Sequence, residues 1–218
     1  MIGILKEKSM HQYLKNYFEP IQENQEVKIG PYYADIFNGN EIIEIQTQNL
    51  NKLREKVTYY LNDYNVRIVY PISHIKYINL TDENGEVKRR KSPKVGTIYD
   101  SIKELYKLKP ILRHDNLRLT FVLIDVEEFR IVNNKSRKHF SKIENIPVKI
   151  EKVININSID EYLIFLDGID NKFTSADLNK KKRIPKEKAS LLLGILNKLG
   201  IIEIVGKQGR YYVYSKLK

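Results

Sequence analysis

The sequence predicts an α/β (α+β) fold in residues 1–150 and a second, smaller domain in residues 151–218. In the first part, short β-type runs alternate with amphipathic helical segments. The last part instead has helical periodicity that ends in a hairpin pattern. A chain of 218 residues is long enough for one substantial hydrophobic core and a smaller second one. We therefore expect two domains.

The first element is a predicted helix from Ile4 to about Phe18, with apolar residues at helical spacing and Pro20 ending the pattern. Three β-type runs follow, and Asn38-Gly39-Asn40 between the last two is a strong hairpin signal. An antiparallel meander is therefore predicted. Its runs are Glu26 to Gly30, Tyr32 to Phe37 and Glu41 to Gln46.

A second amphipathic helix over residues 50–64 and a short apolar strand from Val66 to Tyr70 come next. The order of elements is thus α, β, β, β, α, β. Past Pro71 we expect a hairpin around residues 82–85, a short helix over 99–106, an apolar strand over 117–126 and a basic loop or linker over 134–145.

Capping signals divide the last part of the chain. Ser158 and Glu161 have capping-box spacing before a helix that ends near Leu166, and Thr174 is a natural N-cap for a short helix. Pro185 occupies the favoured first position of a longer helix, which Gly200 stops. A hairpin with its turn at residues 206–209 follows.

This order, three helices and a two-stranded wing, resembles a winged helix-turn-helix domain over residues 155–217. The resemblance implies that the third helix faces the major groove of DNA and that the wing contacts the backbone. The alternative is a winged helix that contacts only proteins. The residues implied are Lys186, Lys188, Ser190 and Asn197 on the helix, and Lys207 and Arg210 on the wing.

Charge favours a polyanionic partner, because the formal net charge is +11 at pH 7. Composition alone is equally consistent with a merely soluble lysine-rich chain. The absence of cysteine excludes disulfides, thiolate metal sites and a cysteine nucleophile. No window approaches the 18 or so apolar residues of a membrane span, and no export signal begins the chain, so a cytoplasmic protein without a membrane partner is expected.

Carboxylates in the predicted meander could carry chemistry. Strand alternation puts Glu44 and Gln46 on one face, and Asp35 on the neighbouring strand can lie beside Glu44. Two adjacent carboxylates are destabilising unless a cation joins them, and Mg²⁺ accepts such oxygen ligands. The plain alternative is a pair of solvated edge charges.

The same residues resemble the PD-(D/E)XK nucleases, which have the restriction-endonuclease-like fold, over about residues 5–72. Asp35 matches the family's Asp, Glu44 matches its second acid, and Gln46 stands where Lys is usual. The run from Glu26 to Gln46 is also similar to the competence-protein CoiA-type branch, in which E-x-Q occurs. The resemblance implies a restriction-endonuclease-like αβββαβ core with a mixed sheet.

The resemblance also implies roles for individual residues. Asp35, Glu44 and the carbonyl of Ile45 would hold Mg²⁺ or Mn²⁺, with Glu26 as a further acidic ligand or a water-mediated one. A neutral Gln46 cannot supply the positive charge of the usual Lys. The candidates to replace it are Lys56 on the following helix and Lys28 on the first strand, and His11 is a candidate phosphate contact or base.

A basic run after this core, with Arg89, Arg90, Lys91 and Lys94, favours phosphate contact over an ordinary solvated loop. The leading hypothesis is a metal-dependent deoxyribonuclease that hydrolyses DNA phosphodiester bonds. The second is a non-catalytic DNA-binding or regulatory protein with a degenerate nuclease fold, which Gln46 favours. The third is an adaptor in which both domains contact proteins. Dimerisation is common in this fold, but no residue here specifies a homodimer.

Overall fold

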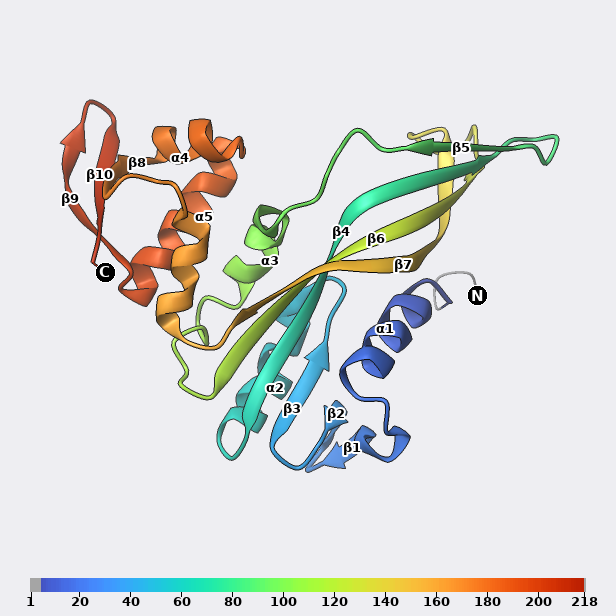
Figure 1. Ribbon diagram of the computed structural model, residues 1–218, viewed down its shortest axis with the longest axis horizontal. Coiled ribbons are helices and arrows are strands. Elements are labelled where there is room, and N and C mark those ends of the chain that lie inside the picture. The colour runs from blue at the N-terminus through green and yellow to red at the C-terminus, as the bar shows by residue number, and fades with distance from the viewer. Residues whose placement is uncertain (1–4, 218) are drawn as a thin grey trace.

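The computed structural model describes residues 5–217, with side chains from residue 9 onward, and shows a mixed α+β protein (Figure 1). Its N-terminal part, here called the body, is built from helices and long strands. The predicted helix start at Ile4 lies outside the described residues. The body comprises α1 (Leu5–Phe18), β1 (Gln25–Ile29), β2 (Tyr32–Phe37), β3 (Glu41–Ile45), α2 (Arg54–Leu61), β4 (Asn65–Thr81), β5 (Val87–Lys91), α3 (Ile102–Lys107), β6 (Leu117–Val132) and β7 (Phe140–Ile156), with 3-10 turns η1 (Gln22–Asn24), η2 (Leu50–Leu53) and η3 (Ile98–Ser101).

Within the described residues, one seven-stranded mixed sheet organises the body, in the order β1-β2-β3-β4-β6-β7 with β5 paired to β4. The first three strands form the predicted antiparallel meander. β4 then runs parallel to both β3 and β6, and β7 returns antiparallel to β6. The order α, β, β, β, α, β is confirmed in the described residues.

The sheet separates two hydrophobic clusters. α1 covers one face, where Met10 and Leu14 pack near Ile45 and Val122. The helices α2 and α3 cover the other face, and Tyr60 is fully buried there. Because β2 and β3 lie between α1 and α2, side chains from both helices can reach the same two strands.

The C-terminal unit contains η4 (Ile159–Leu166), β8 (Lys172–Thr174), α4 (Ser175–Lys182), α5 (Lys186–Leu199), β9 (Ile202–Gln208) and β10 (Tyr211–Lys216). Its described strands form a three-stranded sheet in the order β8-β10-β9. Thr174 caps α4 in a capping box with Asp177, and Gly200, at φ +74°, ends α5 as predicted. Pro185 is the N-cap rather than the first helical residue, and Ser158 makes no side-chain cap bond.

The body and the C-terminal unit share one continuous hydrophobic cluster. Phe165 of η4 is fully buried and has its ring centroid 6.0 Å from that of Tyr99 and 6.2 Å from that of Phe121. The expected boundary at residue 150 falls inside β7, which continues to Ile156. The smaller core expected from the sequence is therefore merged with the larger one.

Two further expectations differ from the structure. β4 runs unbroken through Pro71, because β3 reaches only Val69 on one side of it and β5 begins pairing only at Tyr77. Proline is tolerated at such an open edge, where its missing N–H has no strand partner to bond. Residues 134–145 are not a linker, because they turn directly into β7, whose Phe140 pairs with Val132 of β6. Tertiary strand pairing outweighs their polar composition.

None of the helices within residues 5–217 has the length and apolar character that crossing a bilayer requires.

Candidate functional site

Asp35 and Glu44 meet where β2 and β3 cease to pair through their backbones. The last paired residues are Ile36 with Ile43, so Asp35 and Glu44 occupy the next positions along the ladder. The Oδ2 atom of Asp35 accepts a 2.7 Å hydrogen bond from the N–H of Ile45. A residue in a hydrogen-bonded strand pair directs its N–H and C=O to the same neighbour, so the Ile45 carbonyl also faces β2.

Both carboxylates are shielded from water. The side chain of Glu44 is 1% exposed and that of Asp35 is 15% exposed. The interpretation as solvated edge charges is therefore wrong. An ionised carboxylate this deeply buried is costly unless cations or hydrogen-bond donors compensate it.

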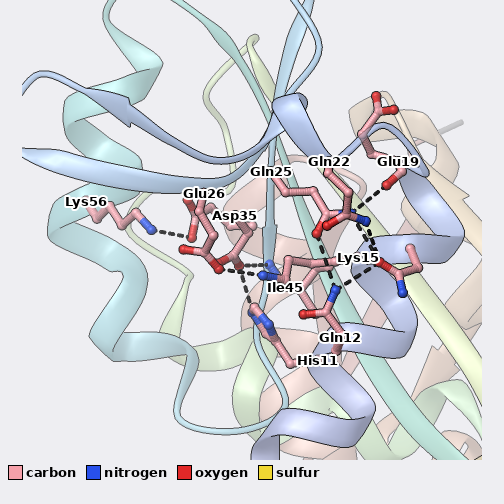
Figure 2. A network of polar contacts seen from close by, with 12 residues as sticks. His11, Gln12, Lys15, Glu19, Gln22, Gln25, Glu26, Asp35, Ile45 and Lys56 are labelled. Atoms are coloured by element: carbon pink, nitrogen blue, oxygen red, sulfur yellow. Dashed lines mark hydrogen bonds and ion pairs between the residues drawn. The ribbon is translucent and has the colours of Figure 1, made fainter.

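Lys56 supplies a cation to this site from α2 (Figure 2). Its Nζ atom lies 2.7 Å from Oε2 of Glu44. Tyr60, one helical turn later on the same helix face, is fully buried, and the Lys56 Nζ lies 5.8 Å from its ring centroid. In the described part of the chain, Oε1 of Glu44 and the hydroxyl of Tyr60 are buried without a hydrogen-bond partner. The site thus holds unused oxygen ligands.

α1 approaches the same strands from the other face of the sheet. Nε2 of His11 lies 3.1 Å from Oδ2 of Asp35, and Nζ of Lys15 lies 2.5 Å from Oε1 of Glu26. Glu26 has a left-handed backbone, with φ 53°, between the ladder pairs of β1 and β2. Its side chain is 58% exposed and binds Lys15. Within residues 9–217, Glu26 forms no hydrogen bond with Asp35 or Glu44.

Burial and nearby charges shift the pKa values of the two central acids, Asp35 and Glu44, in opposite directions. Burial, reinforced by the nearby charge of Asp35, raises the pKa of Glu44 to about 8 despite the opposing effect of Lys56. Burial would also raise the pKa of Asp35, but the hydrogen bond and charge of His11 and the Ile45 N–H hold it below its usual value. Asp35 is therefore ionised at neutral pH, whereas Glu44 retains a proton that a cation can displace.

Gln46 is not part of this cluster. It follows the last residue of β3, and its Nε2 donates to the carbonyl of Gln48. Lys28 is exposed on β1 and forms no ion pair within residues 9–217. Of the two candidate replacements for the missing Lys, the structure brings only Lys56 to the acids.

Sequence reasoning missed Tyr60 and Lys15. Tyr60 falls within the predicted amphipathic helix over residues 50–64, and its position four residues after Lys56 puts the two side chains on one face. Lys15 sits four residues after His11 in the same way. In both cases, a spacing of four residues on a predicted helix indicated that the two side chains lie on the same face.

The basic residues predicted to bind nucleic acid differ in how much they are already engaged. On β5, whose residues are all exposed, Arg89 lies 3.0 Å from Glu127 and stacks 4.3 Å from the Tyr77 ring centroid. Arg90 and Lys91 form no ion pair within residues 9–217.

Asp100 forms ion pairs with two other residues that were predicted to bind nucleic acid. Lys94 lies 2.9 Å from its Oδ1 and Lys188 lies 2.8 Å from the same atom. The side chain of Lys188 is only 17% exposed, so its expected outward position is wrong. The reason is that α5 packs on α3, which turns this side of α5 toward the body.

The remaining predicted contacts lie on α5 and on the wing formed by β9 and β10. Lys207 lies over the ring of Tyr212, and Arg210 lies over that of Tyr211, at 5.0 Å and 5.1 Å from the centroids. Lys186, Ser190 and Asn197 are exposed on α5. Figure 1 shows the wing at one end of the long axis and β5 at the other, so these two basic groups do not form one surface.

A separate group of possible metal ligands lies on the long strands. Within the described residues, His74, Asp125 and Glu151 have ligand atoms within 4.8 Å of one another. Asp125 is already satisfied by Nδ1 of His74 at 2.8 Å and the N–H of Ile75 at 3.0 Å, where β4 is irregular. These contacts stabilise the irregular backbone, so the group does not require a metal.

Residues 8–160 match the family described as Domain of unknown function (DUF8091). This chain belongs to that family. An uncharacterized protein of Treponema pallidum (strain Nichols) is 31% identical over 163 residues, which cover 74% of this chain and 64% of that relative. The chain therefore spans somewhat less than two thirds of the relative's length. No solved structure matches the chain.

The DUF8091 match covers the body but not most of the C-terminal unit. All residues around Asp35 and Glu44, from His11 to Tyr60, lie inside it. Lys186, Lys207 and Arg210 lie outside it. The candidate site is thus a feature of the family region.

Proposed function

We propose that this DUF8091 protein is a metal-dependent endonuclease that hydrolyses DNA phosphodiester bonds. Its body would be a restriction-endonuclease-like PD-(D/E)XK core, and its C-terminal unit a winged helix-turn-helix domain that binds DNA. One observation carries the proposal. Asp35 and Glu44 converge from adjacent strands, and Lys56 comes from α2 to supply the cation that Gln46 lacks.

The donor set fits a hard divalent cation such as Mg²⁺ or Mn²⁺. Asp35 is ionised, Oε1 of Glu44 is buried without a partner, and the Ile45 carbonyl faces the same side as Asp35. Two carboxylates, a carbonyl and water are ligands typical of Mg²⁺. Bound there, the ion would polarise a phosphoryl oxygen and lower the pKa of an attacking water.

Three side chains of the protein would complete the site: Lys56, His11 and Tyr60. Lys56 would offset the charge that develops on the phosphoryl group in the transition state. Burial lowers the pKa of His11, but Asp35 outweighs this effect and holds the pKa above its usual value. His11 would orient Asp35 through their 3.1 Å contact. The hydroxyl of Tyr60, unpaired in the described residues, would hydrogen-bond a water or phosphate oxygen beside Glu44.

The C-terminal unit supports DNA binding through its element order. The short strand β8, the helices α4 and α5 and the β9–β10 hairpin follow the order of a winged helix-turn-helix domain. The proposed contacts are Lys186 at the start of α5 and Lys207 and Arg210 on the wing. Lys188 is not among them, because Asp100 holds it.

A second function is favoured by a specific observation. Each acid already has a basic partner within the protein: Glu26 has Lys15, Asp35 has His11 and Glu44 has Lys56. Together with Gln46 in place of Lys, this arrangement is compatible with a DNA-binding regulatory protein whose body has lost its chemistry.

Cleavage of supercoiled plasmid in Mg²⁺ or Mn²⁺ distinguishes the two. We expect the wild type to nick or linearise the plasmid, and Asp35→Asn to lose at least about 100-fold of that rate, as for loss of a principal charge-stabilising group. Asp63→Asn, an exposed aspartate on the same body, is the matched control and should cleave normally. A folded wild type that binds DNA but cleaves with neither metal would establish the regulatory alternative.

Arg90 and Lys91 of β5, which form no ion pair within residues 9–217, are expected to contribute to DNA affinity. Arg90→Ala combined with Lys91→Ala should weaken binding and reduce the slope of log K against log salt by about 2, one per lost phosphate contact. Fluorescence anisotropy over a salt series measures this slope. The control combines Arg113→Ala with Lys152→Ala, two exposed cations elsewhere on the body, and should leave the slope unchanged. Equal slopes for both double variants would remove β5 from the DNA surface.

A further inference from the structure

An open cavity, separate from the acidic site, lies between the body and the C-terminal unit. It has a volume of about 740 Å³ and is bounded by the start of α2, the end of α3 and the end of α5. This volume lies within the range of small-molecule binding sites, which occur preferentially at junctions between structural units. Four of its lining residues are cations: Arg54, Lys107, Lys109 and Lys198.

Most of this positive charge is not neutralised by the protein. Lys107 lies 2.5 Å from Glu104, but Arg54, Lys109 and Lys198 form no ion pair within residues 9–217. These three cations come from three different segments of the fold, so the fold gathers like charges around one hollow. Such an arrangement creates a positive potential that attracts an anion.

The cavity also has an aromatic wall. The ring of Tyr106 lines it, and this residue is 39% exposed. The Nζ atom of Lys109 lies 5.3 Å from the ring centroid. An exposed aromatic face beside cations can stack a base while the cations bind phosphates.

Gly194 adds an independent observation. It sits inside α5, where glycine is less favourable than alanine by about 1 kcal/mol. A Cβ at this position would lie 3.7 Å from both Nζ of Lys109 and Cε2 of Tyr106, so alanine fits and steric conflict does not explain the glycine. A larger side chain would extend toward the two residues that form the cavity wall.

The cavity and the acidic site use different sides of α2. Arg54 and Lys56 are two residues apart, which separates their side chains by about 200° around the helix. Lys56 faces Glu44, and Arg54 faces the cavity. The two sites can therefore be tested independently.

We propose that this cavity binds a free nucleotide polyphosphate, with the base on Tyr106 and the phosphates among Arg54, Lys109 and Lys198. The ligand would contact α2 and α3 of the body and α5 of the C-terminal unit at the same time. This proposal does not depend on nuclease activity, because none of these residues belongs to the acidic site.

Isothermal titration of the full chain with ATP, in EDTA so that no metal contributes, tests the proposal. We expect saturable binding that weakens at least about tenfold in Arg54→Glu and in Lys198→Glu, since each removes a charge-assisted contact. Tyr106→Ala should lower the affinity for ATP toward that for inorganic pyrophosphate. Gly194→Leu should weaken ATP binding, whereas Gly194→Ala should retain it.

Two controls separate this site from the others. Lys180→Glu, an exposed charge reversal on α4, and Glu44→Gln should both bind ATP like the wild type. The proposal is overturned if no saturable ATP binding occurs by about 1 mM, or if Lys180→Glu weakens it as much as Lys198→Glu. It is also overturned if a single-stranded oligonucleotide binds through Arg54 and Lys198 while ATP does not, because the cavity is then part of a nucleic-acid surface.

Discussion

Replacing Lys56 with glutamine is expected to lower metal-dependent DNA cleavage at least about 100-fold while leaving DNA affinity unchanged. Lys56 reaches Glu44 at 2.7 Å, and it is the cation that compensates for Gln46 in the proposed site. A preorganised positive charge beside a transition state contributes about 10²- to 10³-fold in rate. The loss should appear in kcat, because the side chain is largely buried and is not part of the β5 or wing surfaces.

A double variant that moves the lysine from position 56 to position 46 tests whether the loss of cleavage is due to the missing positive charge. In the proposed PD-(D/E)XK core, adding Gln46→Lys to Lys56→Gln would put a lysine where that family usually has one, and it should restore part of the lost activity. Lys52→Gln, an exposed lysine just before the same helix, should cleave at the wild-type rate. If Lys56→Gln remains folded and cleaves normally, Lys56 has only a structural role, and the cation must be sought elsewhere.

Glu44→Gln is expected to stabilise the protein at pH 8 but not at pH 5. The usual pKa of a glutamate in an unfolded chain is about 4.3, whereas the folded protein raises the pKa of Glu44 to about 8. Between these values the folded state holds a proton that the unfolded state has released, so wild-type stability falls as pH rises. Glutamine mimics the protonated acid and does not titrate. The variant should therefore gain about 3 to 4 kcal/mol of stability relative to wild type between pH 5 and pH 8.

Urea unfolding at pH 5, 6, 7 and 8 measures this difference. Glu203→Gln, an exposed glutamate on β9, should show no such trend. Added Mg²⁺ should stabilise the wild type at pH 8 and have little effect on Glu44→Gln, because a ligand stabilises only the state that binds it. A constant difference between Glu44→Gln and wild type from pH 5 to pH 8 would contradict the raised pKa.

The central acids could be predicted because their placement depends on local rules. Strand alternation and the Asn38-Gly39-Asn40 turn fix which residues of β2 and β3 lie opposite one another, so Asp35 and Glu44 were expected to be neighbours. Their burial could not be predicted, because it depends on α2 and α1 closing over the two faces. The same strands left uncovered would have given solvated carboxylates.

The partners of the basic residues, unlike the neighbouring positions of Asp35 and Glu44, could not be predicted from the sequence. Lys188 has the sequence features of an outward helix lysine, yet it binds Asp100 because α5 packs on α3. Arg89 is engaged by Glu127, a contact made possible by the pairing of β4 with both β5 and β6. Side chains this long take the partner that the fold brings near, and no local pattern specifies that partner.

The sequence by itself determined the order of elements, the hairpin turns, the caps at Thr174 and Gly200 and the neighbouring positions of Asp35 and Glu44. These depend on backbone preferences and on spacing along one or two adjacent segments. Only the tertiary structure decided that Lys56 reaches Glu44, that Pro71 lies within a strand and that both parts share one core. These outcomes depend on contacts between segments far apart in the chain, whose energies come from burial and pairing rather than from local sequence.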